Sequence, residues 1–387
     1  MFVDKHLSPR QQALARAIGH LGGYWPPISA VARLLEELGE LAEILTHRQH
    51  GDAHPTDEEL ADLWIITACL ANQFCITLPD TRQENRGQRT VETEFSNLSL
   101  LLAHAGLIAR IVNYYDGPKP PRAPQDWVPL GKAIKLFHDQ LNNLAEYYKA
   151  DLGAAIDLKI ARTVVRDRGR FKQAFDPSVA LSLEHFERIV TATSCIYAPS
   201  AKLWGSPEWD SQATLKDNVN YFKPYLIRFT KSAQAEGLDS FVVELSDQAA
   251  ASSMPALASR FREFLQTLVE VDPAVNRSFR GPVDRPGWQF TFNGVRLFIS
   301  VFSPVYLDSH PRHSPSGAFV VFQPETSFDH YSIGSAFPQS RKAKERIRSE
   351  FIAHNKWYPG NLIDERIEAR LYILPRSEDD HENEWWH

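Results

Sequence analysis

The first half of the chain carries apolar residues at the spacing of amphipathic α-helices. Clusters of Gly, Pro and polar residues interrupt that pattern, and such clusters mark turns and loops. The pattern predicts helices at residues 9–21, 28–48, 56–76, 91–115, 127–150 and 152–172. We therefore expect an all-α helical bundle over residues 1–175.

The pattern changes near residues 173–182, and beyond it aromatic, Pro and β-branched residues become more frequent. Strands are predicted at residues 240–245, 318–322 and 369–374, with a hairpin over 288–302 around Asn293-Gly294. Helices are predicted near residues 183–194, 214–235, 255–270 and 339–354. The multi-domain chain therefore continues over residues 176–387 as an α+β domain with a mainly antiparallel sheet. Its polar tail, SEDDHENEWWH, is expected to be poorly ordered, with two exposed Trp side chains.

The composition is that of a soluble globular protein, with 43% hydrophobic and 23% charged residues. A net charge of −6 argues against nucleic acids and membranes as general partners. The start of the chain lacks the apolar run of a signal peptide, and no segment reads as long and apolar enough to span a bilayer. The three cysteines form no disulfide or zinc pattern, so a reducing cytoplasmic location is the default expectation.

Two pairs of acidic residues interrupt the apolar faces of two predicted helices. Glu37 and Glu40 lie in LLEELGELAEIL, and Glu59 and Asp62 follow in DEELADLWIITACL, after the eighteen residues 41–58. Residues three apart share a helix face. The apolar stripes beside the two pairs are formed by Leu34, Leu38, Leu41 and Leu45, and by Leu60, Leu63, Trp64, Thr67, Leu70 and Phe74. We expect both stripes to be buried and the four carboxylates to meet where the helices pack.

Carboxylates brought together in this way repel one another unless cations lie between them, and hard oxygen ligands suit Mg²⁺ or Mn²⁺. A buried carboxylate without a partner is also costly. The alternative is two ordinary amphipathic helices with surface acids, in which Glu59 serves only a capping box that begins at Thr56. The occurrence of both pairs in this context favours the metal site.

At these residues the first half resembles the MazG-like, all-α nucleoside triphosphate pyrophosphohydrolases, whose signature is E-x-x-E followed by E-x-x-D on the next helix. The resemblance covers about residues 10–172, including HAGLIARIVNYYDGPKPPR (104–122) and DLKIARTVVRDRGRF (157–171). It implies that the four acids Glu37, Glu40, Glu59 and Asp62 are catalytic and hold Mg²⁺ or Mn²⁺. It also implies hydrolysis of a nucleoside triphosphate to a monophosphate and pyrophosphate, in a homo-oligomer that is a dimer or a tetramer.

The basic helix of the same resemblance offers phosphate-binding residues. Lys159, Arg162 and Arg166 are the candidates, and Arg168 is also available. A basic side chain would help to position the triphosphate. The alternative is an ordinary solvated helix face.

The second half resembles the YqcI/YcgG family from about residue 183 to 375. The resembling segments are SCIYAPSAKLWG (194–205), VDPAVNRSFRGPVDRPGWQFTFNGVRLFISVFSPVY (271–306), HPRHS (310–314) and FVVFQPETSF (319–328). Some members are haem-dependent oxygenases that N-hydroxylate a guanidine or a related nitrogen. The resemblance therefore implies that this half binds haem and uses O₂.

A haem needs an axial ligand, usually His or a Cys thiolate, in an apolar pocket. The candidates are His313, then His310, which lie in a loop after the aromatic hairpin, and then Cys195. Arg312 could pair with a haem propionate or with a substrate phosphate. Structural roles for these histidines are the alternative.

Together the two resemblances predict a bifunctional nucleotide-modifying enzyme of specialised metabolism. One half would N-hydroxylate an amine or guanidine-type nitrogen, on the base of a nucleotide in our hypothesis, and the other would hydrolyse the triphosphate. Electrons would come from an external donor, because the chain has no GxGxxG motif of a nicotinamide or flavin site. Two alternatives stay open: a housecleaning pyrophosphohydrolase with a non-catalytic accessory domain, and a nucleotide-sensing interaction protein.

Overall fold

A computed structural model describes residues 7–49, 56–79, 94–120, 127–166, 175–246, 248–331, 333, 340–360, 365–378, 380 and 384–387. The chain divides into two compact units, Val3–Ser178 and, together with Met1–Phe2, Val179–His387. The predicted boundary, between residues 175 and 176, lies close to this division. Each unit is described by itself below.

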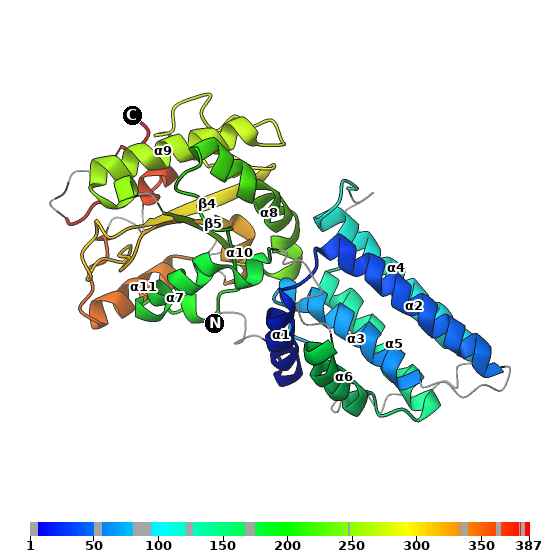
Figure 1. The fold of residues 1–387 in the computed structure, drawn as a ribbon. Coiled ribbons are helices and arrows are strands. Elements are labelled where there is room, and N and C mark those ends of the chain that lie inside the picture. The colour runs from blue at the N-terminus through cyan, green and yellow to red at the C-terminus, as the bar shows by residue number, and fades with distance from the viewer. Residues whose placement is uncertain are drawn as a thin grey trace. The chain divides into compact units, whose positions relative to one another are not determined.

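The described elements of the N-terminal unit are α-helices: α1 (Pro9–Leu21), α2 (Pro27–Gln49), α3 (Thr56–Gln73), α4 (Glu94–Tyr115), α5 (Leu130–Tyr148) and α6 (Leu152–Arg166). The helix α3 packs against α2, α5 and α6, and α4 packs against α2 and α5 (Figure 1). No strand occurs in the described residues of this unit. The predicted helices are confirmed over the described residues, with small differences at their ends, while the predicted helical residues 91–93 and 167–172 lie outside the described part of the chain.

The two predicted apolar stripes lie in the core of the bundle, and that of α3 also faces α5, where Trp64 stacks on His138. Leu34, Leu38, Leu41 and Leu45 of α2 are all buried. The stripe of α3 is buried as well, over Leu60, Leu63, Trp64, Thr67, Leu70 and Phe74. Side chains that point to the same face of each helix thus form one core, and they fix which residues lie at the edge of the contact.

One helix of this bundle corrects an expectation on membrane spans. Within α4, Ser96–Tyr115 is long and apolar enough to cross a membrane by length and composition, with a mean hydropathy of 1.3. Its side chains Leu101, Ile108 and Val112 are buried in the unit. The packing of α4 against α2 and α5 covers these side chains, and 33% of the apolar window is buried in the described structure.

The C-terminal unit is built on a five-stranded sheet in the order β1-β2-β5-β4-β3. The strands are β1 (Leu203–Gly205), β2 (Ser240–Leu245), β3 (Thr291–Phe292), β4 (Val295–Phe302) and β5 (Ala318–Pro324). Only the β1–β2 pairing is parallel, so the prediction of a mainly antiparallel sheet is confirmed. The β3–β4 hairpin turns at Asn293-Gly294, where both residues have positive φ, as a tight two-residue turn requires.

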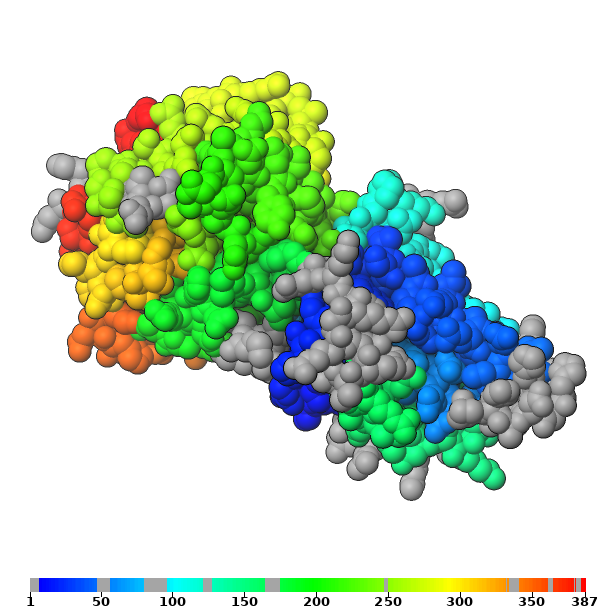
Figure 2. Space-filling model, in the orientation of Figure 1, coloured from blue at the N-terminus to red at the C-terminus, as the bar shows by residue number. Residues whose placement is uncertain are grey.

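Helices cover both faces of this sheet. The helices α8 (Leu215–Glu236) and α9 (Met254–Val271) lie on one face, and α7 (Leu181–Ala192) and α11 (Ser340–Ala353) on the other (Figure 1). In the space-filling view, α8 and α9 lie at the surface of the C-terminal unit, next to each other (Figure 2). Aromatic contacts join the layers: Phe264 of α9 packs on Phe322, while Phe186 of α7 packs on Phe302 and Phe319.

The sequence prediction was wrong in two places near the C-terminus. The strand predicted at residues 369–374 is instead the short 3-10 helix Glu368–Leu371 followed by a turn. The two Trp residues of the tail are buried, not exposed. Trp385 packs against Phe261 and Tyr372, and its indole nitrogen donates to the carbonyl oxygen of Ala369 at 2.7 Å. Both segments belong to the core of the unit, which a local pattern does not reveal.

Candidate functional site

The predicted acidic residues of α2 and α3 lie together at the edge of the contact between these helices. One carboxylate oxygen from each of Glu37, Glu40 and Glu59 lies within 4.8 Å of the others. Glu37 is 1% exposed, Glu59 is half-buried and Glu40 is exposed. The cluster therefore extends from the protein interior to the surface, where a ligand from solvent can reach it.

Two basic side chains meet the cluster from either side. Arg33, one turn before Glu37, forms an ion pair with it. On the other side, Lys159 of α6 places its Nζ 2.5 Å from Oδ2 of Asp62. Each cation also meets a second carboxylate: Arg33 pairs with Glu36, and Nζ of Lys159 lies 3.8 Å from Oε2 of Glu58.

The other predicted phosphate-binding residues differ in position. Arg162 donates to Oε1 of Glu58 at 3.3 Å, and its side chain is 60% exposed. Arg166 ends α6, and its side chain lies outside the described part of the chain. The structure thus brings Lys159 to the acidic cluster and leaves Arg162 at the surface beside it.

The electrostatics of the cluster favour a cation. Burial, with the nearby charge of Asp62, raises the pKa of Glu37 to about 8, and the same causes raise the pKa of Glu59. Atom Oε2 of each of these two side chains is buried without a hydrogen-bond partner among the described residues. Such oxygens are costly unless they bind a proton or a cation. The donor set therefore fits Mg²⁺ or Mn²⁺, which prefer carboxylate oxygens.

The capping alternative for Glu59 is not supported. A capping box would need the Thr56 hydroxyl to accept a hydrogen bond from the backbone of Glu59. The Thr56 Oγ1 atom is buried, and within the described residues it has no hydrogen-bond partner. Glu59 therefore has no capping role that would explain its place in the cluster.

A second candidate site is a cavity of about 750 Å³ in the C-terminal unit. It lies on the face of the sheet that α7 and α11 cover, beside alternate residues of β4: Phe298, Ser300 and Phe302. Apolar side chains make up most of its walls, including Phe186 and Phe351. This volume and lining are typical of a pocket for a small organic molecule.

The predicted residues Arg312 and Cys195 both line this cavity. The guanidinium of Arg312 stands 5.1 Å from the centre of the Phe302 ring, and its Nη2 donates to the carbonyl oxygen of Leu371 at 3.4 Å. Burial lowers the pKa of Arg312. Cys195 carries a free thiol.

The two predicted histidines do not present a free nitrogen to this cavity. His310 is stacked between Tyr306 and Trp357, with Nε2 3.0 Å from the carbonyl oxygen of Pro375. Its Nδ1 accepts from the backbone of Arg312 at 3.0 Å, and burial lowers its pKa to about 3. Both ring nitrogens of His310 are thus engaged by neighbouring backbone groups.

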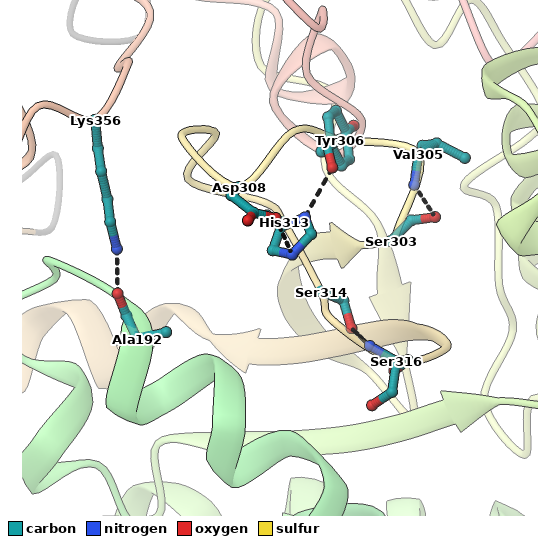
Figure 3. Close-up of polar contacts among 9 residues, drawn as sticks. All are labelled: Ala192, Ser303, Val305, Tyr306, Asp308, His313, Ser314, Ser316 and Lys356. Carbon is teal, nitrogen blue, oxygen red and sulfur yellow. Dashed lines mark hydrogen bonds and ion pairs between the residues drawn. The ribbon is translucent and has the colours of Figure 1, made fainter.

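His313 is held in the same loop (Figure 3). Its Nδ1 lies 2.7 Å from the carbonyl oxygen of Tyr306, and its Nε2 lies 2.9 Å from Oδ1 of Asp308. Both ring nitrogens of His313 thus have partners within the loop. Of the three candidate haem ligands, only Cys195 lines the cavity.

Sequence reasoning missed two carboxylates that line the cavity. Asp239 accepts hydrogen bonds from Ser327 and Tyr331, and Glu368 accepts from Tyr372 at 2.7 Å. Burial raises the pKa of Asp239 and of Glu368. A charged residue directly before the predicted strand at 240–245 was a local signal for Asp239. Glu368 likewise stands directly before a predicted strand, at residues 369–374, but the structure has a 3-10 helix there.

Comparisons with known proteins agree with the division into two parts. The α+β unit that holds the cavity contains the residues that match a known family. The sequence profile of the YqcI/YcgG family matches residues 186–381, and the chain belongs to that family. It is also 36% identical over 85 residues to the uncharacterized protein YpjD of Bacillus subtilis (strain 168), covering 20% of this chain and 77% of that protein. No solved structure matches the chain.

Proposed function

We propose that the N-terminal unit is a divalent-metal-dependent nucleoside triphosphate pyrophosphohydrolase of the MazG-like type. The observation that carries this proposal is the approach of Glu37, Glu40 and Glu59 to within 4.8 Å, with buried oxygens that have no partner among the described residues. An ordinary pair of amphipathic helices has no reason to bury carboxylates without partners. A metal-binding pair of helices needs this arrangement.

The residues of this site have separate roles in the proposed reaction. Glu37, Glu40, Glu59 and Asp62 would hold Mg²⁺ or Mn²⁺. When bound, the ion supplies Lewis-acid chemistry, since it neutralises negative charge on the phosphates and lowers the pKa of water. Lys159 holds Asp62 in position, and Arg162 is exposed beside the cluster, where it can bind a phosphate oxygen. Cleavage between the α and β phosphates would release a monophosphate and pyrophosphate.

The affinity of this site for Mn²⁺ should rise with pH up to about 8. Glu37 binds its proton more tightly in the folded chain than in the unfolded chain, whose reference value is 4.5. The metal-free fold therefore loses stability as pH rises from about 4.5 through about 8, and a metal ion competes with that proton. We expect about tenfold tighter binding per pH unit below pH 8 and a plateau above it.

A titration with Mn²⁺ at pH 6, 7, 8 and 9 measures this dependence. The matched control is Glu37→Gln, in which the pH dependence should become shallower because the titrating carboxyl group is gone. Equal affinity of the unchanged protein at pH 6 and pH 8 would contradict the assignment of Glu37 as a ligand.

We propose as a second function that the C-terminal unit is a haem-dependent oxygenase that N-hydroxylates an amine or guanidine-type nitrogen with electrons from an external donor. The specific observation in its favour is that Cys195 and Arg312 line one large apolar cavity. Cys195 would ligate the iron through its thiolate, and haem when bound supplies O₂ chemistry. In this proposal the two units act on the same nucleotide in consecutive steps.

The visible absorption spectrum of the full-length protein, reconstituted with haem, tests this second function. We expect a Soret band that shifts on reduction with dithionite and on addition of CO, and that is lost in Cys195→Ala. Cys69→Ala, which removes a cysteine of the other unit, should keep the band. Absence of the band after reconstitution would contradict the haem proposal, and its persistence in Cys195→Ala would contradict the ligand.

A further inference from the structure

Arg312 lines the cavity of the C-terminal unit, and among the described residues no carboxylate pairs with it. Its guanidinium stands over the Phe302 ring and donates to the carbonyl oxygen of Leu371. The side chain lies deep in the unit, while the residue keeps an intermediate exposure. Both facts agree with a side chain that faces the cavity.

A buried guanidinium that lacks a counter-ion is costly to keep in a folded protein. This free-energy cost is offset when an anion enters the cavity and accepts hydrogen bonds from the remaining N–H groups of the guanidinium. The planar guanidinium can donate two parallel hydrogen bonds, which match a carboxylate or a phosphate. The position of Arg312 therefore indicates a ligand with one anionic group.

The other walls of the cavity indicate what the rest of that ligand is. Aromatic side chains surround the space, from the sheet, from the helices and from the loops: Phe186, Tyr197, Phe298, Phe302, Tyr331 and Tyr358. Such rings favour a flat, apolar-faced group, which they can contact by stacking or edge to face. The polar groups Asp239 and Glu368 can accept hydrogen bonds from N–H groups at its rim.

The charges that line the cavity limit the anion to a small one. Five carboxylates line it, Asp239, Glu325, Asp329, Glu365 and Glu368, against the three cations Arg312, Lys344 and Arg366. A triphosphate would add several negative charges to this surface and would be repelled. A single phosphate group at Arg312 would not meet this obstacle.

We infer that the cavity binds a nucleoside monophosphate, with the phosphate at Arg312 and the base between the aromatic walls. A nucleoside monophosphate is the product of the hydrolysis proposed for the N-terminal unit. The ligand of the second unit is thus made by the first, and hydrolysis precedes any modification of the base. The order of the two steps rests on that proposed function, whereas the binding itself does not.

Isothermal titration calorimetry on the full-length Glu40→Gln protein, free of haem and with metal removed by EDTA, tests this inference. These conditions suppress binding at the acidic cluster of the other unit. The probes are AMP, GMP, CMP and UMP, together with adenosine and ATP. We expect at least one monophosphate to bind. If AMP binds, its affinity should be at least tenfold higher than the affinities of adenosine and ATP.

Variants of Arg312 in the same background assign the binding to this residue. We expect Arg312→Gln to weaken the monophosphate at least tenfold, as the loss of a charge-assisted hydrogen bond does. Arg312→Lys should weaken it less, because the charge remains. Arg341→Gln is the matched control, since the Arg341 side chain is 66% exposed and pairs with Glu345 on α11, and it should leave the affinity unchanged.

A second measurement avoids the variants, in case Arg312→Gln does not fold. Cys195 lines the same cavity, so a bound monophosphate should slow its alkylation by iodoacetamide, read by mass spectrometry, more than adenosine does. The inference is overturned if no monophosphate binds, if Arg312→Gln binds as tightly as its parent, or if only haemin binds in an Arg312-dependent manner. Failure of triphosphate hydrolysis in the unchanged protein would overturn the proposed function and leave this binding result intact.

Discussion

Replacing Glu40 by Gln should lower Mg²⁺-dependent hydrolysis of a nucleoside triphosphate by about a thousandfold or more. Glu40 is the exposed member of the carboxylate cluster, and the change keeps its size while removing its charge. A metal ion contributes several kcal/mol of transition-state stabilisation, and each 1.36 kcal/mol is worth about tenfold in rate. The rate of pyrophosphate release at saturating Mg²⁺ measures the effect.

The matched control for this experiment is Glu43→Gln on the same helix. Glu43 is exposed and is not among the three carboxylates that approach one another to within 4.8 Å, so hydrolysis should stay within about twofold of the unchanged protein. The same comparison distinguishes the two enzyme hypotheses from the hypothesis of a nucleotide-sensing interaction protein. Unchanged turnover in Glu40→Gln would refute the metal site, and a housecleaning enzyme would show the loss without any oxygenation by the other unit.

Replacing Trp385 by Ala should destabilise the C-terminal unit by about 3–5 kcal/mol, the range for removing a large buried aromatic side chain. Trp385 is 2% exposed and packs against Phe261, Trp288 and Tyr372. Its indole N–H also donates to the carbonyl oxygen of Ala369, which would lose this partner. The last residues of the chain therefore close the core of this unit.

The free energy of unfolding in urea, compared with that of Tyr221→Ala, measures this contribution. Tyr221 is 58% exposed, so its replacement should change the free energy of unfolding by about 0.5 kcal/mol or less. A loss below about 1 kcal/mol in Trp385→Ala would show that the tail does not form part of the core.

Local periodicity was sufficient for most of the N-terminal unit. The Leu34 to Leu45 stripe and its partner on α3 were predicted from spacing alone, because each helix buries one face and the pattern records that face. The same pattern placed Glu37 and Glu59 at the edge of the contact. It did not predict the ion pairs of the site, since Lys159 lies about a hundred residues from Asp62 along the chain.

Long-range packing explains what the sequence pattern missed in the C-terminal unit. Residues 369–374 are mostly apolar, and Ala369, Tyr372, Ile373 and Leu374 are buried. Such a run reads as a strand, although the chain there forms a 3-10 helix and a turn. The histidines of the HPRHS segment look like ligands in sequence. In the structure, contacts with Tyr306, Asp308 and Pro375 use their nitrogens. Only the assembled fold shows such partners.

The most direct test of the central claim is ³¹P NMR of a nucleoside triphosphate incubated with the full-length protein and Mg²⁺. The account predicts that a monophosphate and pyrophosphate appear in equal amounts, and that neither appears with EDTA or with Glu40→Gln. Formation of a diphosphate and inorganic phosphate, or no turnover of any of the common ribo- and deoxyribonucleoside triphosphates, would contradict it.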